Sequence, residues 1–326
     1  MPRLLPSVVA LLTLLPIDQR AQSEQRLTPA IPVEAGNAGA DAKVVAPTPA
    51  GISAKAWAII DGKTGKPLWS FHDAEARPIA STTKIMTAWI ILQRADKNPK
   101  LLDEEIRFSE RAAAVGGSSC RLKIGERLPV RELLYGLLLP SGNDAAVALA
   151  EHFGPRLQSG EPAKEDGVRL FVAEMNRQAK SLKLGETKFL DPNGLARNQA
   201  SARDLAVLTW HAMQNSRFRE YVKTRVHEYE VRADADTKRR VTWKNTNRLL
   251  EDASCDGVKT GTTRAAGACL VASAHQGADR LIVVVLGSTS GDGRYEDAHK
   301  LLGWAWEQRG GKIEKPKETK KGQPRS

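Results

Sequence analysis

The folded part of the chain begins with two short apolar runs and continues into a long helical pattern. Residues 56–60 and 67–72 flank the polar, glycine-containing turn 61–66, which predicts a β-hairpin. Apolar residues at helical spacing then predict a helix that starts close to Ser81. Four further helices are expected at 130–139, 144–153, 168–182 and 202–214, the last one after the capping residue Ser201.

The last third of the chain changes from helical periodicity to strand alternation. Strands are expected at 226–231, from Val241 onward, at 257–263, at 267–274 and at 281–287, with a final helix at 295–307. Strands at both ends around a helical middle predict a mixed α+β fold. In such a fold an antiparallel sheet is covered by helices, and we expect its first and last strands to be neighbours.

Composition narrows the class of protein. The 326 residues are 41% apolar and 27% charged, which suffices for one large domain or two intimate ones and excludes a collagen-like or wholly disordered chain. The net charge is +11, and residues 309–326 contribute +5 of it through seven basic and two acidic side chains. This excess suits an anionic polymer or membrane surface. Aromatic residues make up only 5% and no basic stripe is interleaved with them, which argues against a nucleic-acid partner.

The two ends of the chain differ from its centre. Residues 1–23 have a basic start, a short apolar run and small residues near Ala21, which predicts a secretory signal peptide rather than a membrane span. Residues 24–53 are rich in Pro and Ala and predict a linker. Residues 309–326 predict a disordered basic tail without an amphipathic face, so the folded domain is expected at 54–308.

Cysteines and histidines give no sign of a metal site. Cys120, Cys255 and Cys269 are widely spaced and odd in number, so neither a disulfide framework nor a metal knuckle is indicated, and we expect each to be a small buried residue. The six histidines include no paired spacing on a helix face. The sequence therefore implies no metal and no cofactor.

Nucleophilic chemistry is suggested by Ser81-Thr82-Thr83-Lys84. A spacing of three places the serine and the lysine on the same helix face. The apolar neighbours of Lys84 are expected to lower its pKa, so that its amine can act as a base toward Ser81, and the helix N-terminus favours a developing oxyanion. Taken alone, the motif is equally met by a serine cap followed by a solvent-facing lysine.

Two further motifs follow in a fixed order. Ser141-Gly142-Asn143 is expected in a turn before a helix, where it would present two polar side chains to a cleft. Lys259-Thr260-Gly261 is expected in a strand with edge N–H groups available to an extended ligand. The copy at 63–65 is explained by its hairpin turn, and it is not part of a phosphate loop because residue 57 is Trp57.

With these three motifs in helix, turn and strand, the chain resembles the penicillin-binding serine D,D-peptidases, and in particular the low-molecular-mass D-alanyl-D-alanine carboxypeptidase family. The likeness covers about residues 54–305 and implies a β-lactamase/D,D-peptidase-like fold, an antiparallel sheet flanked by helices with a helical subdomain. The segments that match the family are residues 80–88, 116–119, 140–146, 191–195, 256–261 and 266–267.

The resemblance implies roles for the first two motifs. Ser81 would attack the carbonyl of the penultimate D-alanine, and Lys84 would take its proton. Ser141 would relay a proton toward the leaving amine, while Asn143 would hold the substrate amide.

The resemblance also implies a carboxylate-binding end. Lys259, Thr260 and Gly261 would line the substrate strand, with Lys259 and Thr260 binding the terminal carboxylate or steadying the proton network. The backbone N–H groups of Ser81 and Thr262 would form the oxyanion hole, and Arg294 would reach the same carboxylate unless it is an ordinary surface arginine.

The activity so implied is release of terminal D-alanine from peptidoglycan stem pentapeptides through an acyl-enzyme, with β-lactams as covalent inhibitors. Two alternatives stay open: a D,D-endopeptidase that cuts cross-links, and a sensor or binding module that is acylated by penicillin. The expected location is the periplasm or cell envelope, with no transmembrane anchor. The basic tail would add a weak contact to anionic wall polymer or lipid.

Several positions depart from the family. Cys120 replaces a family methionine and Asn193 replaces a frequent histidine; we expect neither to touch the three motifs, though both could alter the lip of the cleft. The chain leaves no room after Glu307 for the β-rich domain and anchor that family members often carry. No Glu-x-x-Leu-Asn element lies between Ser141 and Lys259, so rapid penicillin hydrolysis is not expected.

Overall fold

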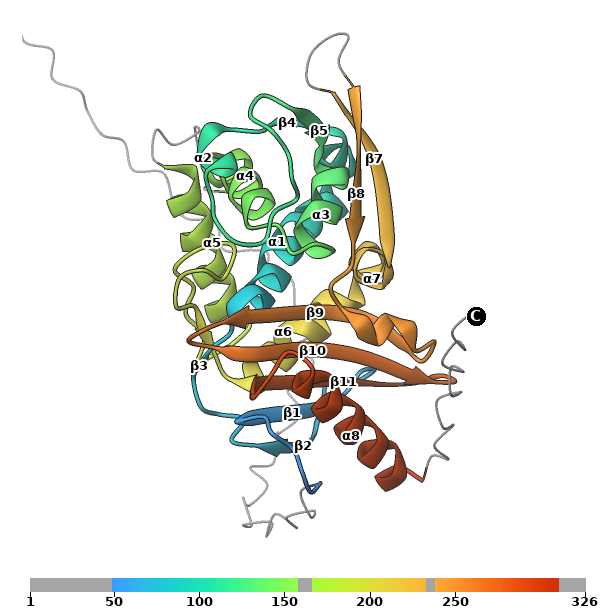
Figure 1. The fold of residues 1–326 in the computed structure, drawn as a ribbon. Coiled ribbons are helices and arrows are strands. Elements are labelled where there is room, and N and C mark those ends of the chain that lie inside the picture. Colours follow the sequence, from blue (N-terminus) through green and yellow to red (C-terminus); the bar gives the residue numbers. More distant parts are fainter. Residues whose placement is uncertain (1–48, 158–165, 233–237, 311–326) are drawn as a thin grey trace, which may run out of the picture. The chain divides into compact units, whose positions relative to one another are not determined.

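Pairing between the two ends of the folded chain organises the main sheet. The computed structural model describes residues 49–157, 166–232 and 238–310. Its five-stranded antiparallel sheet has the order β2-β1-β11-β10-β9 (Figure 1). The strands are β1 (Ala56–Asp61), β2 (Pro67–Phe71), β9 (Cys255–Thr263), β10 (Gly267–Gln276) and β11 (Asp279–Ser288). Ala58 pairs with Val284, so the expectation that the first and last strands are neighbours is confirmed.

Alternate residues of these strands enter two different cores. Trp57 and Ile59 of β1 pack with Val283 of β11 against helix α8 (Gly293–Gln308). Ala58 and its next-but-one neighbours belong to the larger core on the other face. All six residues of β1 are buried, as expected for a strand covered on both faces. Figure 1 shows α8 on one face of the sheet and α6 on the other.

Helices fill the middle of the chain, as the periodicity predicts, although the two short helices at 110–113 and 216–223 were not expected. The helices are α1 (Lys84–Lys97), α2 (Glu110–Ala113), α3 (Val130–Leu138), α4 (Asn143–Phe153), α5 (Gly167–Ser181), α6 (Ala202–Gln214) and α7 (Ser216–Lys223). Capping agrees with the sequence at α6, where Ser201 Oγ accepts a hydrogen bond from the N–H of Asp204 at 3.0 Å. The three cysteines are buried and free, as expected.

A second sheet lies beside the helices and was predicted only in part. Its order is β4-β5-β7-β8, formed by β4 (Glu105–Arg107), β5 (Arg127–Pro129), β7 (Val226–Arg232) and β8 (Lys238–Lys244). Strand alternation predicts β7 and β8. The other two strands have three residues each, which is too short for a periodicity to appear. A further two-residue ladder joins β3 (Arg77–Pro78) to β6 (Gln199–Ala200).

Several sequence expectations fall outside the described residues. The signal peptide, nearly all of the linker, the turn at 233–237 and the tail from residue 311 onward belong to this group. Among the helices of the described ranges, none combines the length and apolar character needed to cross a bilayer.

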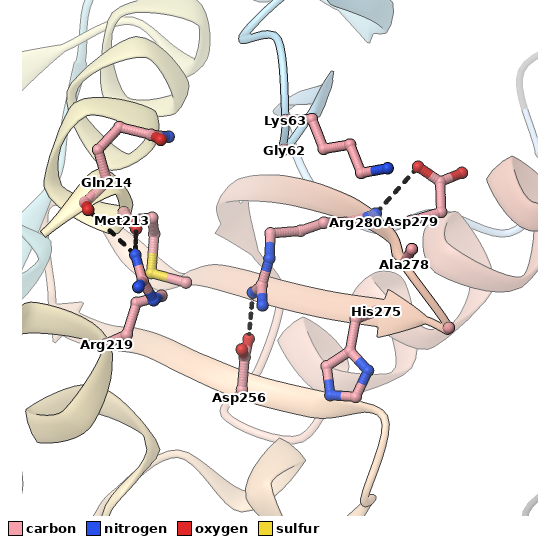
Figure 2. A pocket seen from close by; sticks show the side chains of 11 residues that line it. Gly62, Lys63, Met213, Gln214, Arg219, Asp256, His275, Ala278, Asp279 and Arg280 are labelled. Atoms are coloured by element: carbon pink, nitrogen blue, oxygen red, sulfur yellow. Dashed lines mark hydrogen bonds and ion pairs between the residues drawn. The ribbon is translucent and has the colours of Figure 1, made fainter. Parts of the chain in front are cut away.

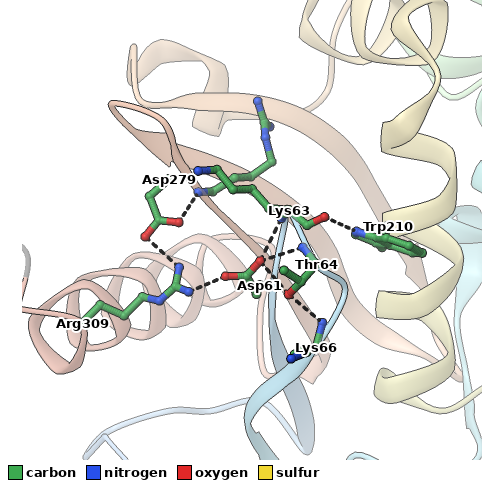
Figure 3. A network of polar contacts seen from close by, with 8 residues as sticks. Asp61, Lys63, Thr64, Lys66, Trp210, Asp279 and Arg309 are labelled. Carbon is green, nitrogen blue, oxygen red and sulfur yellow. Dashed lines mark hydrogen bonds and ion pairs between the residues drawn. The ribbon is translucent and has the colours of Figure 1, made fainter.

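A polar network at the end of β1 explains the first Lys-Thr-Gly sequence (Figure 3). Asp61 Oδ1 accepts hydrogen bonds from the N–H groups of Lys63 and Thr64 at 3.0 and 2.8 Å and from Thr64 Oγ1 at 2.9 Å. Arg309 contacts Asp61 Oδ2 and donates to Asp279 Oδ2 at 2.8 Å. The triplet therefore builds a hairpin turn that anchors the end of α8, as its turn composition predicts.

Replacing Asp61 by Asn is expected to destabilise the fold in a pH-dependent way. Burial opposes ionisation of Asp61, but hydrogen bonds from Thr64 and Arg309 outweigh it and lower its pKa from 3.8 to about 2. The charged form therefore stabilises the fold above pH 3.8, by about 2 kcal/mol, and this stabilisation is lost as the pH falls toward 2. Urea unfolding of both proteins at pH 7 and pH 2.5 measures the difference.

Asp103→Asn provides the control, because Asp103 forms an ion pair with Arg131 in which both side chains are about half exposed. An exposed pair of this kind contributes little, so the unfolding midpoint should barely move. An equal loss for Asp61→Asn at both pH values would show that its charge is not the stabilising element.

Candidate active site

Ser81 lies in a tight 3-10 turn, η1 (Ala80–Thr83), that leads directly into α1. Two threonine hydroxyls hold this turn: Thr82 Oγ1 donates to the carbonyl of Ile79 and Thr83 Oγ1 to that of Ala80, both at 2.7 Å. Ala80 has a φ of +48°, an uncommon value for a residue with a Cβ. The serine thus precedes the helix proper by one turn and remains partly exposed, while its neighbours are buried.

The amine of Lys84 is surrounded by three oxygen atoms. Lys84 Nζ lies 2.9 Å from Ser81 Oγ, 2.7 Å from Asn143 Oδ1 and 2.6 Å from the carbonyl oxygen of Asn193. The lysine has no exposed surface. Burial, followed by repulsion from Lys259, holds the pKa of Lys84 well below its usual 10.5, although Asp191 and Asp144 act in the opposite direction.

This geometry assigns the protons of the lysine. A neutral amine has two N–H donors and one lone pair. The oxygens of Asn143 and Asn193 are carbonyl oxygens and can only accept, so they take the two N–H groups. The lone pair is then left for the hydroxyl of Ser81, which can donate its proton to Lys84 Nζ. A buried amine held in this way is a base aimed at a nucleophile.

Asn143 is fixed in the orientation that this assignment needs. Its Nδ2 donates to the carbonyl of Gly116 at 2.9 Å, and its backbone N–H donates to that of Ser118 at 2.7 Å. Asp144, next in the chain, accepts from the N–H of Cys120 at 2.9 Å. Residues 116–120 are thereby bound to the start of α4. An added Cβ at Gly117, whose φ is +84°, would lie only 2.7 Å from Asn143 Nδ2.

The loop that supplies the third oxygen was not assigned a role from the sequence. Asp191 Oδ1 accepts from the N–H groups of Asn193 and Gly194 at 3.1 and 2.6 Å. Asn198 Nδ2 links the loop to Thr83 Oγ1 at 3.0 Å. The expectation that Asn193 stays clear of the three motifs is therefore wrong, because its backbone carbonyl binds Lys84. Its side chain is buried and accepts from the N–H of Leu195, so a different residue type can occupy the position without changing that contact.

Cys120 is the other position that departs from the family, and its side chain does not border the cleft. It has no exposed surface, and its carbonyl accepts from Trp243 Nε1 at 2.8 Å. The expectation that Cys120 could alter the lip of the cleft is therefore also wrong, because its side chain is buried in the core.

Ser141 is held in strained backbone and offers an unused hydroxyl. Its φ is +66°, and the residue is 5% exposed. Its Oγ has no hydrogen-bond partner in the described part of the chain. A buried hydroxyl without a partner costs free energy, and contact with a bound ligand would supply the missing hydrogen bond.

The Lys259-Thr260-Gly261 motif lies on β9, an edge strand of the main sheet, beside η1. A Cβ added to Gly261 would lie 3.0 Å from the backbone nitrogen of Ser81 and 3.1 Å from that of Thr82. Lys259 is buried, and its Nζ donates to the carbonyl of Thr260 at 3.0 Å. Burial, with added repulsion from Arg294, lowers the pKa of Lys259 to about 7.

Arg294 joins this strand from the first turn of α8. Its Nη1 donates to Thr262 Oγ1 at 2.8 Å and to the carbonyl of Gly261 at 3.1 Å. No described carboxylate forms an ion pair with it, so a cation without a counterion lies beside the motif. The structure therefore brings together all nine residues that the sequence singles out, which are Ser81, Lys84, Ser141, Asn143, Lys259, Thr260, Gly261, Thr262 and Arg294.

A hollow of about 500 Å³ lies elsewhere, around the turn between β10 and β11 (Figure 2). Its two arginines already bind internal groups: Arg280 Nη1 donates to Asp256 Oδ1 at 2.7 Å, and Arg219 Nη1 donates to backbone carbonyls at the end of α6. None of the three motifs lines it. The described residues also contain no cluster of His, Cys, Asp and Glu able to hold a metal ion.

Comparisons with known proteins agree with this geometry. The family described as D-alanyl-D-alanine carboxypeptidase matches residues 43–290. D-alanyl-D-alanine carboxypeptidase DacF of Bacillus subtilis is 36% identical over 78% of this chain and 62% of its own length. DacD of Salmonella typhimurium is 38% identical over 81% of this chain and 66% of its own length. The chain thus spans a little under two thirds of the length of these two relatives. The carboxypeptidase of Streptomyces sp. K15 is 36% identical over 83% of this chain and 93% of its own length.

Solved structures show the same fold. The DD-transpeptidase of Streptomyces K15 superposes with a TM-score of 0.73 at 36% identity, covering 80% of this chain and 99% of that one. DacD of Francisella tularensis gives a TM-score of 0.70 at 31% identity, with 80% and 72% covered. The β-lactamase/D,D-peptidase-like fold expected from the motifs is thereby confirmed.

Replacing Gly261 by Ala is expected to lower the reactivity of Ser81 without unfolding the protein. The new methyl group would press on backbone atoms of η1, which cannot rotate away, so β9 must move outward. Labelling of Ser81 with a fluorophosphonate should slow by up to roughly tenfold, since contacts at 3.0 Å require a shift of a few tenths of an ångström and a misplacement of about 1 Å costs about 100-fold. Gly185→Ala is the matched control, because its Cβ would meet nothing within 4 Å. Equal labelling of both variants would contradict the close-contact argument.

The pH dependence of the same labelling reports on Lys84. Its amine is a base only when neutral, so the rate should rise with pH through its lowered pKa and level off well below pH 10.5. Lys84→Ala should slow labelling by about 100-fold or more. A wild-type midpoint near 10.5, or a fast Lys84→Ala variant, would exclude Lys84 as the base.

Proposed function

The chain belongs to the D-alanyl-D-alanine carboxypeptidase family, and from that premise we propose that it is a serine-type peptidase that removes the terminal D-alanine from peptidoglycan stem pentapeptides. One observation carries the proposal above all. The buried amine of Lys84 lies 2.9 Å from Ser81 Oγ, while two carbonyl oxygens bind its remaining protons. This arrangement supports an activated serine, and the resemblance supplies the substrate.

In the first half of the reaction, Ser81 Oγ attacks the carbonyl carbon of the penultimate D-alanine as its proton passes to Lys84 Nζ. The carbonyl oxygen becomes an oxyanion, stabilised by the backbone N–H groups of Ser81 and Thr262. As the C–N bond breaks, the hydroxyl of Ser141 donates a proton to the leaving amine and accepts the proton that Lys84 holds. D-Alanine leaves, and the peptide remains as an ester on Ser81.

In the second half, water attacks the ester, Lys84 accepts a proton from the water, and Ser81 regains its hydroxyl. Asn143 holds the amide of the substrate beside Lys84 throughout. Attack by a peptide amine in place of water would give transpeptidation from the same ester.

The substrate carboxylate is bound at the other end of the site. Arg294 supplies a cation without a counterion among the described residues. Thr262 Oγ1 lies 2.8 Å from its Nη1, and Thr260 supplies a second hydroxyl on the same strand. Lys259 adds a second cation when it is protonated, which its pKa of about 7 allows near neutral pH. The requirement for a free carboxylate places cleavage at the last peptide bond of the stem.

Location follows from the substrate. We assign the chain to the cell envelope, with residues 1–23 as the signal for export and residues 309–326 as a basic segment with weak affinity for anionic wall polymer or lipid. β-Lactams, which acylate serines of this kind, are the expected covalent inhibitors.

Ser81→Ala is expected to abolish both reactions that define this function. The full chain and the variant are incubated separately with benzylpenicillin and with a peptide ending in D-Ala-D-Ala, and covalent mass and free D-alanine are measured. Acylation and D-alanine release should both fall to background, because Ser81 Oγ is the hydroxyl that hydrogen-bonds to Lys84 Nζ among the described residues. Thr83→Ser is the matched control, since it keeps the hydroxyl that binds Ala80.

The outcomes separate the readings of the site. Acylation with D-alanine release supports a carboxypeptidase. Acylation without release favours an endopeptidase or a penicillin sensor, and cleavage of a cross-linked dimer distinguishes these two. Absence of Ser81-dependent acylation would refute the assignment of the nucleophile.

A further inference from the structure

Tyr295 is a buried residue at the start of α8 that the motifs do not include. Its ring contacts two guanidinium groups: the Cζ atom of Arg248 lies 4.4 Å from the ring centre, and that of Arg294 lies 5.2 Å from it. These are distances at which a cation is attracted to an aromatic ring. The two arginines differ in charge balance, because Arg248 is paired with Asp292, whereas Arg294 has no ion-pair partner among the described residues.

The hydroxyl of Tyr295 reaches a second point of the site. It donates to the carbonyl of Thr246 at 2.8 Å. Thr246 Oγ1 lies 2.8 Å from Thr260 Oγ1, and the N–H of Thr246 donates to the carbonyl of Leu139 at 3.0 Å. Leu139 lies two positions before Ser141. Thr246 therefore binds the start of α8, the substrate strand β9 and the Ser141 turn with its three polar groups.

The position of Arg294 depends on neutral groups alone. Its Nε donates to the carbonyl of Gly291 at 3.1 Å, and its Nη1 donates to Thr262 Oγ1 and to the carbonyl of Gly261. These bonds fix one side of the guanidinium. The Tyr295 ring lies against its face and limits the remaining rotation of a long side chain, which otherwise loses considerable entropy when it is held in place.

We propose that Tyr295 is a positioning residue for the recognition of a substrate carboxylate: its ring orients Arg294, and its hydroxyl, through Thr246, orients Thr260. Both donors then face the same carboxylate of a peptide with a free C-terminal D-residue. The inference rests on the proposed function, because it takes Arg294 and Thr260 as carboxylate ligands. It extends that function by naming the element that selects a free acid over a blocked C-terminus.

A purely structural role predicts a different result. Tyr295 also packs in the core between α8 and the sheet, so its loss can destabilise the fold and lower every activity alike. A positioning role affects the free acid selectively. The informative quantity is therefore the ratio of kcat/KM for a peptide ending in D-Ala-D-Ala to that for the same peptide with a C-terminal amide.

The test compares Tyr295→Leu, Tyr295→Phe and Arg294→Ala in the full chain. Tyr295→Leu should lower the acid-to-amide ratio by about tenfold, mainly through the KM for the acid, because a cation–π contact of this kind is lost. Tyr295→Phe keeps the ring and should lower it by roughly threefold, as expected for one hydrogen bond. Arg294→Ala should lower it most, and Tyr295→Leu should add little in that background.

Trp306→Leu is the matched control, since Trp306 is another buried aromatic residue of α8 in the same core. It should lower thermal stability but leave the ratio unchanged. If Tyr295→Leu lowers the rates on acid and amide by the same factor, as Trp306→Leu does, the positioning role is overturned.

Failure of the proposed function is distinguishable from failure of this inference. If the wild-type chain releases no D-alanine, the ratio is measured instead from acylation of Ser81 by benzylpenicillin and by its methyl ester. A ratio that falls in Tyr295→Leu still supports the positioning role, and an unchanged ratio overturns it. Absence of acylation by either compound overturns both proposals.

Discussion

Burial of one lysine amine among three oxygen atoms is the constraint on which the rest of the site depends. Lys84 Nζ can act as a base because burial disfavours its charged form. The carbonyl oxygens of Asn143 and Asn193 can only accept, so the lone pair of the amine is left for the hydroxyl of Ser81. Two of its partners come from segments far from it in the chain, the start of α4 and the 191–198 loop. Much of the helical region therefore serves to bring carbonyl oxygens to Lys84 Nζ. The strained backbone at Ala80 and Ser141 is tolerated because surrounding hydrogen bonds hold it.

The sequence was sufficient for the parts of the fold that depend on side-chain periodicity. The longer central helices and the pairing of β1 with β11 follow from apolar spacing, whereas the short helices α2 and α7 were missed. Most of the site side chains follow from three short motifs, and Thr262 and Arg294 follow only from the family resemblance. The rest depends on atoms that all residues share. The carbonyls of Asn193 and Gly116 have no signature of their own, and only the Asp191-Pro192-Asn193-Gly194 turn hinted at the first. The three-residue strands β4 and β5 pair with each other, and β5 joins β7 through Arg127 and Arg232, which no local pattern reveals.

Two kinds of basic side chain, lysine and arginine, lie in the site, and they differ in burial and in protonation. Lys84 and Lys259 are buried, and burial lowers the pKa of each, well below its usual value for Lys84 and to about 7 for Lys259. Arg294 stays charged because a guanidinium does not lose its proton in proteins. A site that must both move a proton and hold an anion thus divides these tasks between lysine and arginine. Close packing of Gly261 against the backbone of Ser81 keeps the strand that carries Lys259 next to the serine.

The pairing of Ala58 with Val284 has a consequence for how the chain matures. The central strands of the sheet come from opposite ends of the folded region, so the sheet cannot close until translation has passed β11, and such long-range pairing is slow. Ser81 and Lys84 are synthesised early, whereas the strand and the arginine that complete their surroundings arrive late. A nascent or partly threaded chain therefore carries an unassembled nucleophile, and the complete site forms only after the whole domain has left the ribosome and, for an exported chain, the translocation channel.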